Sequence, residues 1–524
     1  MDRVERKIGR MSRKDVLKLG LLGSAALMLS LERTARAEWS SGDRLASSQV
    51  PEPFQVPFVA PPVLMPVRSD ETTDYFEMTM RSARVPIIPG RPDTEIYGYN
   101  GISPGPTVKV ARGRRAVVRQ INGLPEVSRF GYKTTTSVHL HGNASEPQYD
   151  GYAEDVTAPG SYKDYVYPND QDERMLWYHD HAIHHTAENA YMGLAGAYIT
   201  DEQLALPIPK GRYDVPLVIR DATFDTDGQF LYEDDGENTI QGDVVLVNGR
   251  PWPVMKVERR KYRFRLLNAS LSRSYRLALS TGDPLTVIGT DAGLMPAPQQ
   301  TGSFRFGMSE RYEVVIDFAK YPVGTKVDLK NLGLPNNDNF SSTENVMRFE
   351  VASEATDTTN NEVPSELNPN MEVMGLKPSE AIRTRTWDFD KDRSLGWTIN
   401  GKVWDKNRID ANPALGDVEI WEFRTRSSRW FHPIHVHLVD FKILSRNGNA
   451  PFNYEKGSKD VVYVGEDETV RVIMKFGPRK GKYMIHCHNL VHEDHDMMTQ
   501  FQVGSDGPDP VTAAPPKPLP APPL

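Results

Sequence analysis

The sequence predicts an all-β protein made of three similar Greek-key β-sandwich domains. An Asn-Gly turn, followed by a strand-like stretch studded with basic residues, occurs at Asn100, Asn248 and Asn400, at spacings of 148 and 152 residues. A near-constant period of this length indicates repeated domains and not a short solenoid repeat. In the second repeat, apolar and basic residues alternate from Tyr262 to Leu266, which is the two-residue period of a half-buried strand. Short strands, turns rich in Pro and Gly, and few long helical patterns support the same fold class.

The chain has 524 residues, which suits about three domains of ordinary size. A segment rich in Asn, Glu and Pro indicates a linker before the third repeat, and a run of prolines and alanines at the end predicts an extended, disordered tail. The expected order is an export signal over 1–37, a first domain over 50–205, a second domain over 206–356, a linker over 357–378, a third domain over 379–504 and the tail over 505–524.

The first residues resemble a secretory signal. Basic residues precede an apolar run, Leu19 to Leu31, which ends before Ala35-Arg36-Ala37, an Ala-x-Ala cleavage pattern. The run is too short for a transmembrane helix, which needs about 20 apolar residues, so we expect no membrane span. Ser12-Arg13-Lys14 is similar to a twin-arginine signal except that Lys14 replaces the second arginine, which leaves the general secretory route open. We expect a secreted or otherwise extracytoplasmic protein.

Charge narrows the class of partner. The net charge of −8 argues against nucleic acid and gives no reason to expect an anionic membrane surface. The chain has one cysteine, Cys487, so no intramolecular disulfide forms. A lone thiol in an exported protein needs a reason, because exposed thiols oxidise.

The histidines are the strongest functional signal. All 13 fall in four short stretches, and none lies between His185 and His432. Imidazole is a poor core filler, so repeated H-x-H pairs indicate metal ligands; His184, His185 and His495 are equally well explained as bystanders. The stretches are HLHG (His139, His141), WYHDH with the two histidines that follow it (His179, His181, His184, His185), HPIHVH (His432, His435, His437) and HCHNLVHEDHDMM (His486, His488, His492, His495).

Ligand chemistry selects the metal. Imidazole-rich sites with few carboxylates suit copper, zinc, iron or nickel, and a single thiolate excludes Cys-rich zinc and iron–sulfur sites. One cysteine, two histidines and a methionine describe a blue-copper electron-transfer centre. His432, Cys487 and His492 supply its trigonal set, with Met497 as the axial candidate and Met498 less favoured. A bound thiolate also explains why one cysteine is kept.

Strand geometry places the other metals. Alternate residues of a strand face the same side, so His486 and His488 point together while Cys487 points oppositely. Electrons accepted at Cys487 therefore have a covalent route to whatever the flanking histidines hold. Eight histidines remain for a three-copper cluster, half from the first domain and half from the last, so the cluster should lie at their interface, with the middle domain as a scaffold: His139, His141, His179, His181, His435, His437, His486 and His488.

The four histidine motifs, in this order and spacing, resemble those of the multicopper oxidases. The text between them, including YDGYAEDVTAPGSYKDY and RKYRFRLLNAS, is most similar to the bilirubin oxidases over nearly the whole mature chain, and less so to spore-coat laccases and phenoxazinone synthase. This resemblance implies three cupredoxin domains and four coppers, one type 1, one type 2 and two type 3. It implies type 2 ligation by His139 and His435, and type 3 ligation by His141, His179, His181, His437, His486 and His488.

The resemblance also points to groups around the metals. Asp150 and Glu493 match carboxylates associated with proton delivery, which dioxygen reduction in a buried site requires. Each is alternatively a carboxylate that only orients a ligand. Trp430 either lines the surface near the blue copper or is an ordinary packed tryptophan. The candidate catalytic residues are therefore Cys487, as the point of electron entry, Asp150, Glu493 and Trp430.

We therefore expect an oxidase that takes single electrons from a small aromatic donor, such as a phenol, an aminophenol or bilirubin, and reduces dioxygen to water. An axial methionine gives a lower potential than leucine or phenylalanine, which favours easily oxidised donors. One alternative is a metallo-oxidase of cuprous or other metal ions, which the lack of a methionine-rich insert disfavours. Another is a non-enzymatic copper store or coat protein, which would not need a covalent route for electrons through Cys487.

Overall fold

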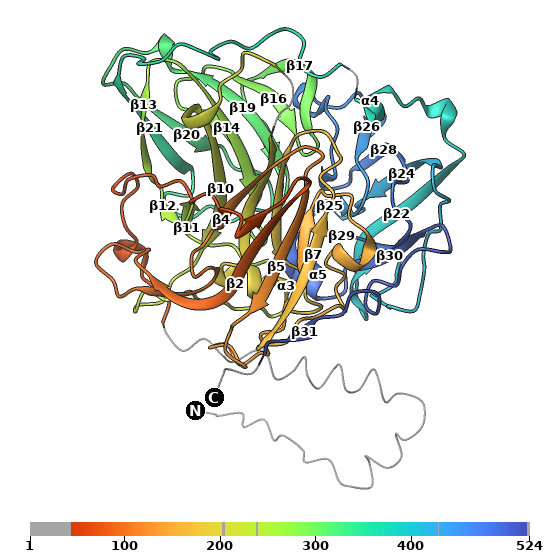
Figure 1. Cartoon of the computed structure of the whole chain (residues 1–524). Helices are drawn as coiled ribbons and strands as arrows, with labels where there is room; N and C mark the ends of the chain where they lie inside the picture. The colour runs from red at the N-terminus through yellow and green to blue at the C-terminus, as the bar shows by residue number, and fades with distance from the viewer. Residues whose placement is uncertain (1–42, 202–204, 237–238, 370, 428, 521–524) are drawn as a thin grey trace, which may run out of the picture.

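The computed structural model describes residues 43–201, 205–236, 239–369, 371–427 and 429–520. The predicted export signal over 1–37 lies outside these residues. The described chain is mostly strand, and its α-helices are short: α3 (Thr186–Met192), α4 (Glu372–Gly375) and α5 (Leu490–Asp494). The strands form six sheets, two for each third of the chain, which confirms the predicted all-β class (Figure 1).

The first domain has two facing sheets. One contains β1 (Arg68–Ser69), β2 (Thr73–Val85), β3 (Thr94–Tyr99), β5 (Arg115–Asn122) and β7 (Ser161–Tyr167). The other has the order β4 (Gly105–Ala111), β9 (Ala195–Asp201), β8 (Met175–Asp180) and β6 (Val138–His141).

The second domain, green in Figure 1, contributes the largest sheet. Its order is β12 (Arg250–Pro251), β11 (Val244–Val247), β10 (Asp214–Ala222), β14 (Lys261–Asn268), β19 (Arg311–Asp317), β16 (Leu285–Thr290) and β17 (Gly293–Thr301). The second sheet has the order β13 (Val254–Glu258), β21 (Asn345–Ser353), β20 (Lys326–Asn331), β15 (Tyr275–Leu279) and β18 (Phe304–Phe306).

The third domain, blue in Figure 1, has one five-stranded and one four-stranded sheet. The first runs β23 (Gly396–Ile399), β22 (Arg383–Asp392), β24 (Val418–Arg424), β28 (Thr469–Lys475) and β26 (Phe441–Arg446). The second runs β27 (Val461–Val464), β25 (His432–Val436), β29 (Gly481–Cys487) and β30 (Met498–Val503). Its apolar core is separate from the continuous core shared by the first two domains.

The three Asn-Gly repeats occupy equivalent places in the three domains. Asn100, Asn248 and Asn400 all have positive φ, as does the glycine after each, which is the backbone of a tight hairpin turn. Each asparagine side chain also accepts a hydrogen bond from a backbone N–H, at 2.9, 2.8 and 2.7 Å respectively. The donors lie in β2, β10 and β22, and each of these strands pairs in parallel with a later strand of the same domain. The repeat seen in the sequence is therefore a structural repeat.

The strand that we expected to be half-buried is buried on both faces. In β14, Arg263 and Arg265 alternate with the apolar residues, as the sequence shows, yet both arginines are buried. They form ion pairs with Glu313 of the adjacent β19, and Arg265 also pairs with Asp214 at 2.7 Å. Paired carboxylates let a central strand bury arginines, which a two-residue alternation by itself does not predict.

The end of the chain differs from the disordered tail predicted for 505–524. Residues 505–520 are described, and β31 (Lys517–Pro518) pairs antiparallel with β7 of the first domain. The Leu519 N–H donates to the Gly160 carbonyl at 2.9 Å. The segment is extended, as its prolines predict, but tertiary contacts hold it against the first domain.

The segment 357–378, predicted as a linker, starts along the second domain and ends on the third. Arg260, fully buried, donates to the carbonyls of Thr359 and Asn360, and Lys442 of the third domain donates to the Met374 carbonyl at 2.9 Å.

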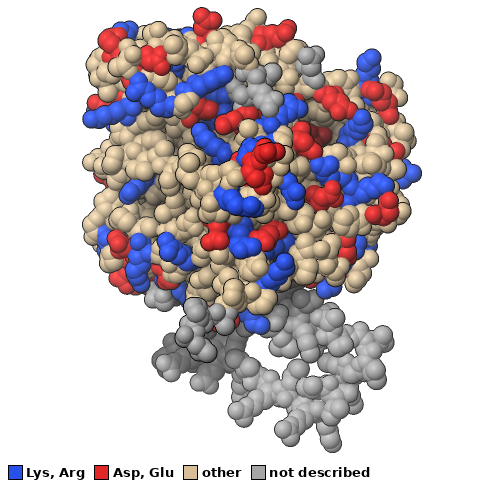
Figure 2. Space-filling view, in the orientation of Figure 1, with Lys and Arg blue, Asp and Glu red and all other residues tan. Residues whose placement is uncertain are grey.

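On the face shown in Figure 2, acidic and basic side chains of the described residues are interspersed without an extended patch of either sign. None of the described helices has both the length and the apolar character needed to cross a membrane.

Candidate metal centres

The strand pairings bring the H-x-H motifs together. In the first domain β6 pairs with β8, which places His139 opposite His179, and in the third domain β25 pairs with β29, which places His435 opposite His486. A strand presents alternate residues on one face, so each H-x-H pair directs two imidazoles the same way. The histidines of the two domains then meet between the two sheets.

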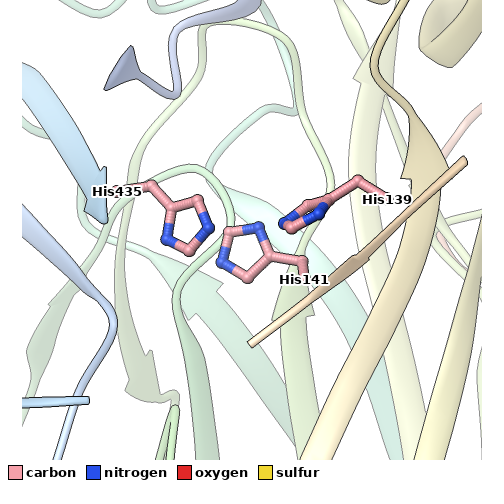
Figure 3. A group of neighbouring side chains, drawn as sticks. All are labelled: His139, His141 and His435. Carbon is pink, nitrogen blue, oxygen red and sulfur yellow. The ribbon is translucent and has the colours of Figure 1, made fainter. Parts of the chain in front are cut away.

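Eight buried histidines form three groups in this interface, two of which share His141. Within each group the ligand atoms lie within 4.8 Å of one another. The groups are His139, His141 and His435; His141, His179 and His488; and His181, His437 and His486. Figure 3 shows the first group, in which the three rings lie side by side; the His141 and His435 rings stack with centroids 3.6 Å apart. All eight histidines that the sequence assigned to the cluster are present in these groups.

A fourth group lies in the core of the third domain. The Cys487 sulfur is 3.4 Å from His432 Nδ1 and 3.7 Å from His492 Nδ1, and the Asn489 N–H donates to it at 3.3 Å. Burial raises the pKa of the Cys487 thiol, so its ionised form needs a nearby cation. Met497 packs in the same apolar cluster as Cys487, whereas Met498 packs in a different cluster with Tyr152. The packing therefore favours Met497 over Met498 as a neighbour of the sulfur.

The protonation state of the cluster histidines suits metal binding. Burial lowers the pKa of His179 to about 3 and that of His181 to about 4, which leaves both imidazoles neutral at physiological pH. Neutral imidazole is the form that binds a metal. Several ring nitrogens of the cluster are buried and have no hydrogen-bond partner among the described residues: Nε2 of His139, His179 and His435, Nδ1 of His141 and His181, and both nitrogens of His488.

In His179 and His435 the opposite ring nitrogen is held from outside the groups. His179 Nδ1 lies 2.7 Å from the Asp180 carbonyl, and His435 Nδ1 lies 2.9 Å from the Asp460 carbonyl. Such bonds fix the tautomer and the ring orientation of a metal-binding histidine and leave its other nitrogen free. The orphaned nitrogens and the Cys-His-His set together fit soft and imidazole-binding metal ions.

Comparisons with known proteins decide the family. Three family models described as multicopper oxidase match residues 82–204, 177–325 and 375–507. The bilirubin oxidase of Albifimbria verrucaria is 42% identical over 476 residues, covering 86% of this chain and 81% of that protein. The laccase of Bacillus subtilis is 33% identical over 499 residues, covering 84% and 97%. A multicopper oxidase structure from Pediococcus acidilactici, 29% identical, superposes with a TM-score of 0.77 over 87% of this chain and 93% of that one.

The chain belongs to the multicopper oxidases. Its sandwiches are the three cupredoxin-like domains of this family, as the histidine motifs predicted. The family's four coppers, one type 1, one type 2 and two type 3, fit the buried Cys487 group and the cluster of eight buried histidines.

Two carboxylates predicted near the cluster of this oxidase lie on different sides of it. Asp150 Oδ2 accepts a hydrogen bond from His437 Nδ1 at 2.7 Å, and the Asp150 carbonyl contacts His139 Nδ1. Glu493 lies 3.1 Å from His486 Nδ1 and 3.4 Å from His181 Nδ1.

The two acids have opposite electrostatic environments. Burial raises the pKa of Asp150 well above its usual value. Burial would also raise the pKa of Glu493, but the facing His181 and His486 lower it to about 2. One carboxyl is thus favoured in its protonated form and the other in its ionised form.

Trp430 lies beside the Cys487 group. It is partly buried, and its ring meets the His492 ring edge-on at 5.7 Å. A second tryptophan, which the sequence did not single out, lies closer: Trp397 is fully buried and stacks on His492 with centroids 3.6 Å apart. Trp397 follows a Gly in β23 with no motif around it, so no local signal identifies it.

Other residues were also missed or left open. Asp460, beyond the HPIHVH motif in the chain, contacts His141 and His435. His184, His185 and His495 belong to none of these ligand groups and instead contact the Asp494 carbonyl, Glu188 and Asp234, respectively. The bystander interpretation accounts for these three histidines.

Proposed function

We propose that this multicopper oxidase accepts single electrons from a small organic donor beside His492 and passes them along the chain at Cys487 to the histidine cluster, where dioxygen is reduced to water. When bound, the coppers supply one-electron acceptance and the four-electron reduction of dioxygen. The observation that carries the proposal is that Cys487 belongs to one ligand group, whereas His486 and His488, its two neighbours in the chain, belong to two others.

The ligand groups support a specific assignment of the coppers. His432, Cys487 and His492 would hold type 1, with Met497 as the axial residue. His139 and His435 would hold type 2. The group of His181, His437 and His486 would hold one type 3 copper, and the group of His141, His179 and His488 the other.

Protons for the water that forms would come through the two buried acids. Asp150 serves the side of His139 and His437, where its Oδ2 accepts a hydrogen bond from His437 Nδ1. Glu493 serves the side of His181 and His486. A positioned carboxyl within hydrogen-bond reach of the reacting site is what general acid–base catalysis requires. If the acids only orient the histidines, Glu493→Gln should leave the rate of dioxygen reduction unchanged.

An aromatic donor fits the outer side of the Cys487 group. Trp430 is only partly buried there and its ring meets the His492 ring edge-on, so it offers an aromatic surface beside a residue that shares a ligand group with Cys487. The similarity to a bilirubin oxidase favours a tetrapyrrole such as bilirubin, with phenols and aminophenols as further donors.

A metallo-oxidase is the second candidate. A structural neighbour from Campylobacter jejuni is described as a metallo-oxidase, but at 24% identity it shows the fold alone. The donor comparison separates the two: oxygen uptake should be faster with bilirubin or an aminophenol than with cuprous ion. A higher rate with cuprous ion than with every organic donor would replace the proposal by the metallo-oxidase.

We also propose export of the mature chain, from the order of basic residues, apolar run and Ala-x-Ala within 1–37. Amino-terminal sequencing of the protein recovered outside the cytoplasm should begin after Ala37. An intact amino terminus would contradict export by cleavage.

A further inference from the structure

A buried ionic cluster joins the second and third domains next to the histidines. It consists of two cations and three carboxylates, each no more than 1% exposed: Asp291, Glu310, Arg311, Lys459 and Asp460. Lys459 Nζ lies 3.0 Å from Asp291 Oδ2 and 3.1 Å from Glu310 Oε1. Burying five charges is costly unless each is paired, so this cluster needs a reason beyond stability.

Arg311 clamps Asp460. Its Nη1 donates to Asp460 Oδ1 at 2.7 Å and its Nη2 to Asp460 Oδ2 at 2.5 Å, which is a bidentate pair. The same guanidinium donates to the Met175 carbonyl of the first domain at 3.2 Å and to the Ser309 carbonyl at 3.1 Å. Contacts with all three domains fix the plane of the carboxylate.

Asp460 in turn holds two cluster histidines. Its Oδ1 accepts from His141 Nε2 at 3.1 Å, and its carbonyl accepts from His435 Nδ1 at 2.9 Å. With Nε2 held in this way, His141 is left with a buried Nδ1 that has no hydrogen-bond partner among the described residues. His141 is therefore oriented differently from His139, whose free nitrogen is Nε2.

Asp291 places the backbone that carries Asp460. Its Oδ2 accepts from the N–H groups of Asp460 and Val461, both at 3.2 Å, and its Oδ1 accepts from the Arg311 N–H at 2.7 Å. Val461 begins β27, where it pairs with His435 of β25. Residues of the second domain thus fix the position of both the side chain and the backbone of Asp460.

Gly142, the glycine after His141 in the HLHG motif, lies very close to the Arg311–Asp460 ion pair. A Cβ on Gly142 would lie 2.6 Å from Asp460 Oδ2 and 2.7 Å from Arg311 Nη2, and its φ is +87°. Only glycine fits where the ion pair passes the HLHG turn.

We propose that Arg311, from the domain without histidines, is a positioning residue for the histidine cluster. It acts through Asp460, which orients His141 and His435 toward the metal. The middle domain is then more than a scaffold. The charges support this role: three carboxylates outnumber two cations, so Asp460 remains a strong acceptor for His141 while Arg311 holds it in place. The inference rests on the proposed function, because it takes His141 as a ligand.

The test measures copper retention against a chelator in the fully loaded enzyme, with copper per chain and blue absorption read together. Arg311→Lys keeps the charge but loses the bidentate geometry. Asp460→Asn keeps the shape but loses the charge. Both should release cluster copper at about 10- to 100-fold lower chelator concentration while keeping the blue absorption of the Cys487 group, because removing a partner that orients a metal ligand weakens affinity by that factor.

Arg273→Lys is the matched control. Arg273 is equally buried in the same domain and is paired with Asp221 at 2.8 Å, but its hydrogen bonds go to Asp221, Gly242 and Asp338, none of which is a cluster histidine. This variant should lower the melting temperature without changing copper retention.

Retention like that of the wild type in both Arg311→Lys and Asp460→Asn would overturn the inference, as would equal copper loss in Arg273→Lys. If Arg311→Lys fails to fold, Asp460→Asn decides alone. A wild-type protein that does not bind four coppers would instead overturn the proposed function.

Discussion

The two metal centres of this oxidase are built in different ways. The Cys487 group comes from the third domain alone and lies in that domain's apolar core, with Trp397 stacked on His492. The histidine cluster takes half its residues from the first domain and half from the third, and buried carboxylates surround it. The first centre depends on one domain folding correctly, whereas the second also depends on how the domains dock.

Direct contacts between the first and third domains help to hold them together near the cluster. Arg174 pairs with Asp440 at 2.8 Å, the Tyr152 hydroxyl donates to Gln500 Oε1 at 2.8 Å, and the Tyr483 hydroxyl donates to the Ser145 carbonyl at 2.9 Å. The difference between the centres therefore predicts that the cluster loses copper before the Cys487 group does when docking is weakened.

The largest effect is expected from Cys487→Ser. Cys487 is the one cysteine of the sequence, so this variant has no thiolate ligand. Blue absorption should therefore vanish, and oxygen uptake with any donor should fall to the uncatalysed background. Visible spectroscopy and oxygen uptake measure both. Full oxidase activity in this variant would show that electrons do not enter at Cys487.

Glu493→Gln should slow the reaction by about 10²-fold or more, the usual contribution of a general acid or base. The amide keeps the shape beside His181 and His486 but exchanges no proton. Blue absorption should persist, because Glu493 belongs to the cluster side only. Rapid-mixing reoxidation of the reduced enzyme by dioxygen gives the rate, and an unchanged rate reduces Glu493 to an orienting role.

Arg174→Ala should separate the two centres. Asp440 loses its cation in a largely buried position, which should cost about 1–3 kcal/mol of unfolding free energy. Copper per chain should fall while blue absorption remains. The control is Arg385→Ala, which breaks an ion pair with Glu419 inside the third domain and should reduce stability without loss of cluster copper. Loss of the blue centre before the cluster would refute the docking argument.

The smallest effect is expected from Met497→Leu. Removing the axial thioether should raise the reduction potential of the blue centre without abolishing its colour. A redox titration followed by visible absorption measures the shift. Met498→Leu provides the control, because that side chain packs with Tyr152 instead of Cys487 and should leave the potential unchanged. A shift in Met498→Leu alone would reverse the axial assignment.

Much of the fold and of the cluster was predictable because the signals are local. Asn-Gly turns mark the repeat, and H-x-H pairs in strands place two imidazoles on one face. The two-residue period of a strand also predicts that Cys487 and its neighbours in the chain face different ligand groups. These features depend on residues close together in the chain.

The residues that were missed act across long separations. Asp460 reaches His141 over 319 positions, and Arg311 reaches Asp460 over 149. The buried arginines of β14 and the ordered end of the chain likewise depend on partners that only tertiary packing supplies. No motif links such pairs, so a single sequence does not reveal them.

Metal analysis of the loaded wild type and Cys487→Ser tests the central claim most directly, namely that one stretch of strand connects two kinds of centre. The account predicts four coppers per chain in the wild type and three in the variant, with the blue absorption lost and the cluster intact. Zinc in place of copper, a single copper per chain, or the same copper content in both proteins would contradict it.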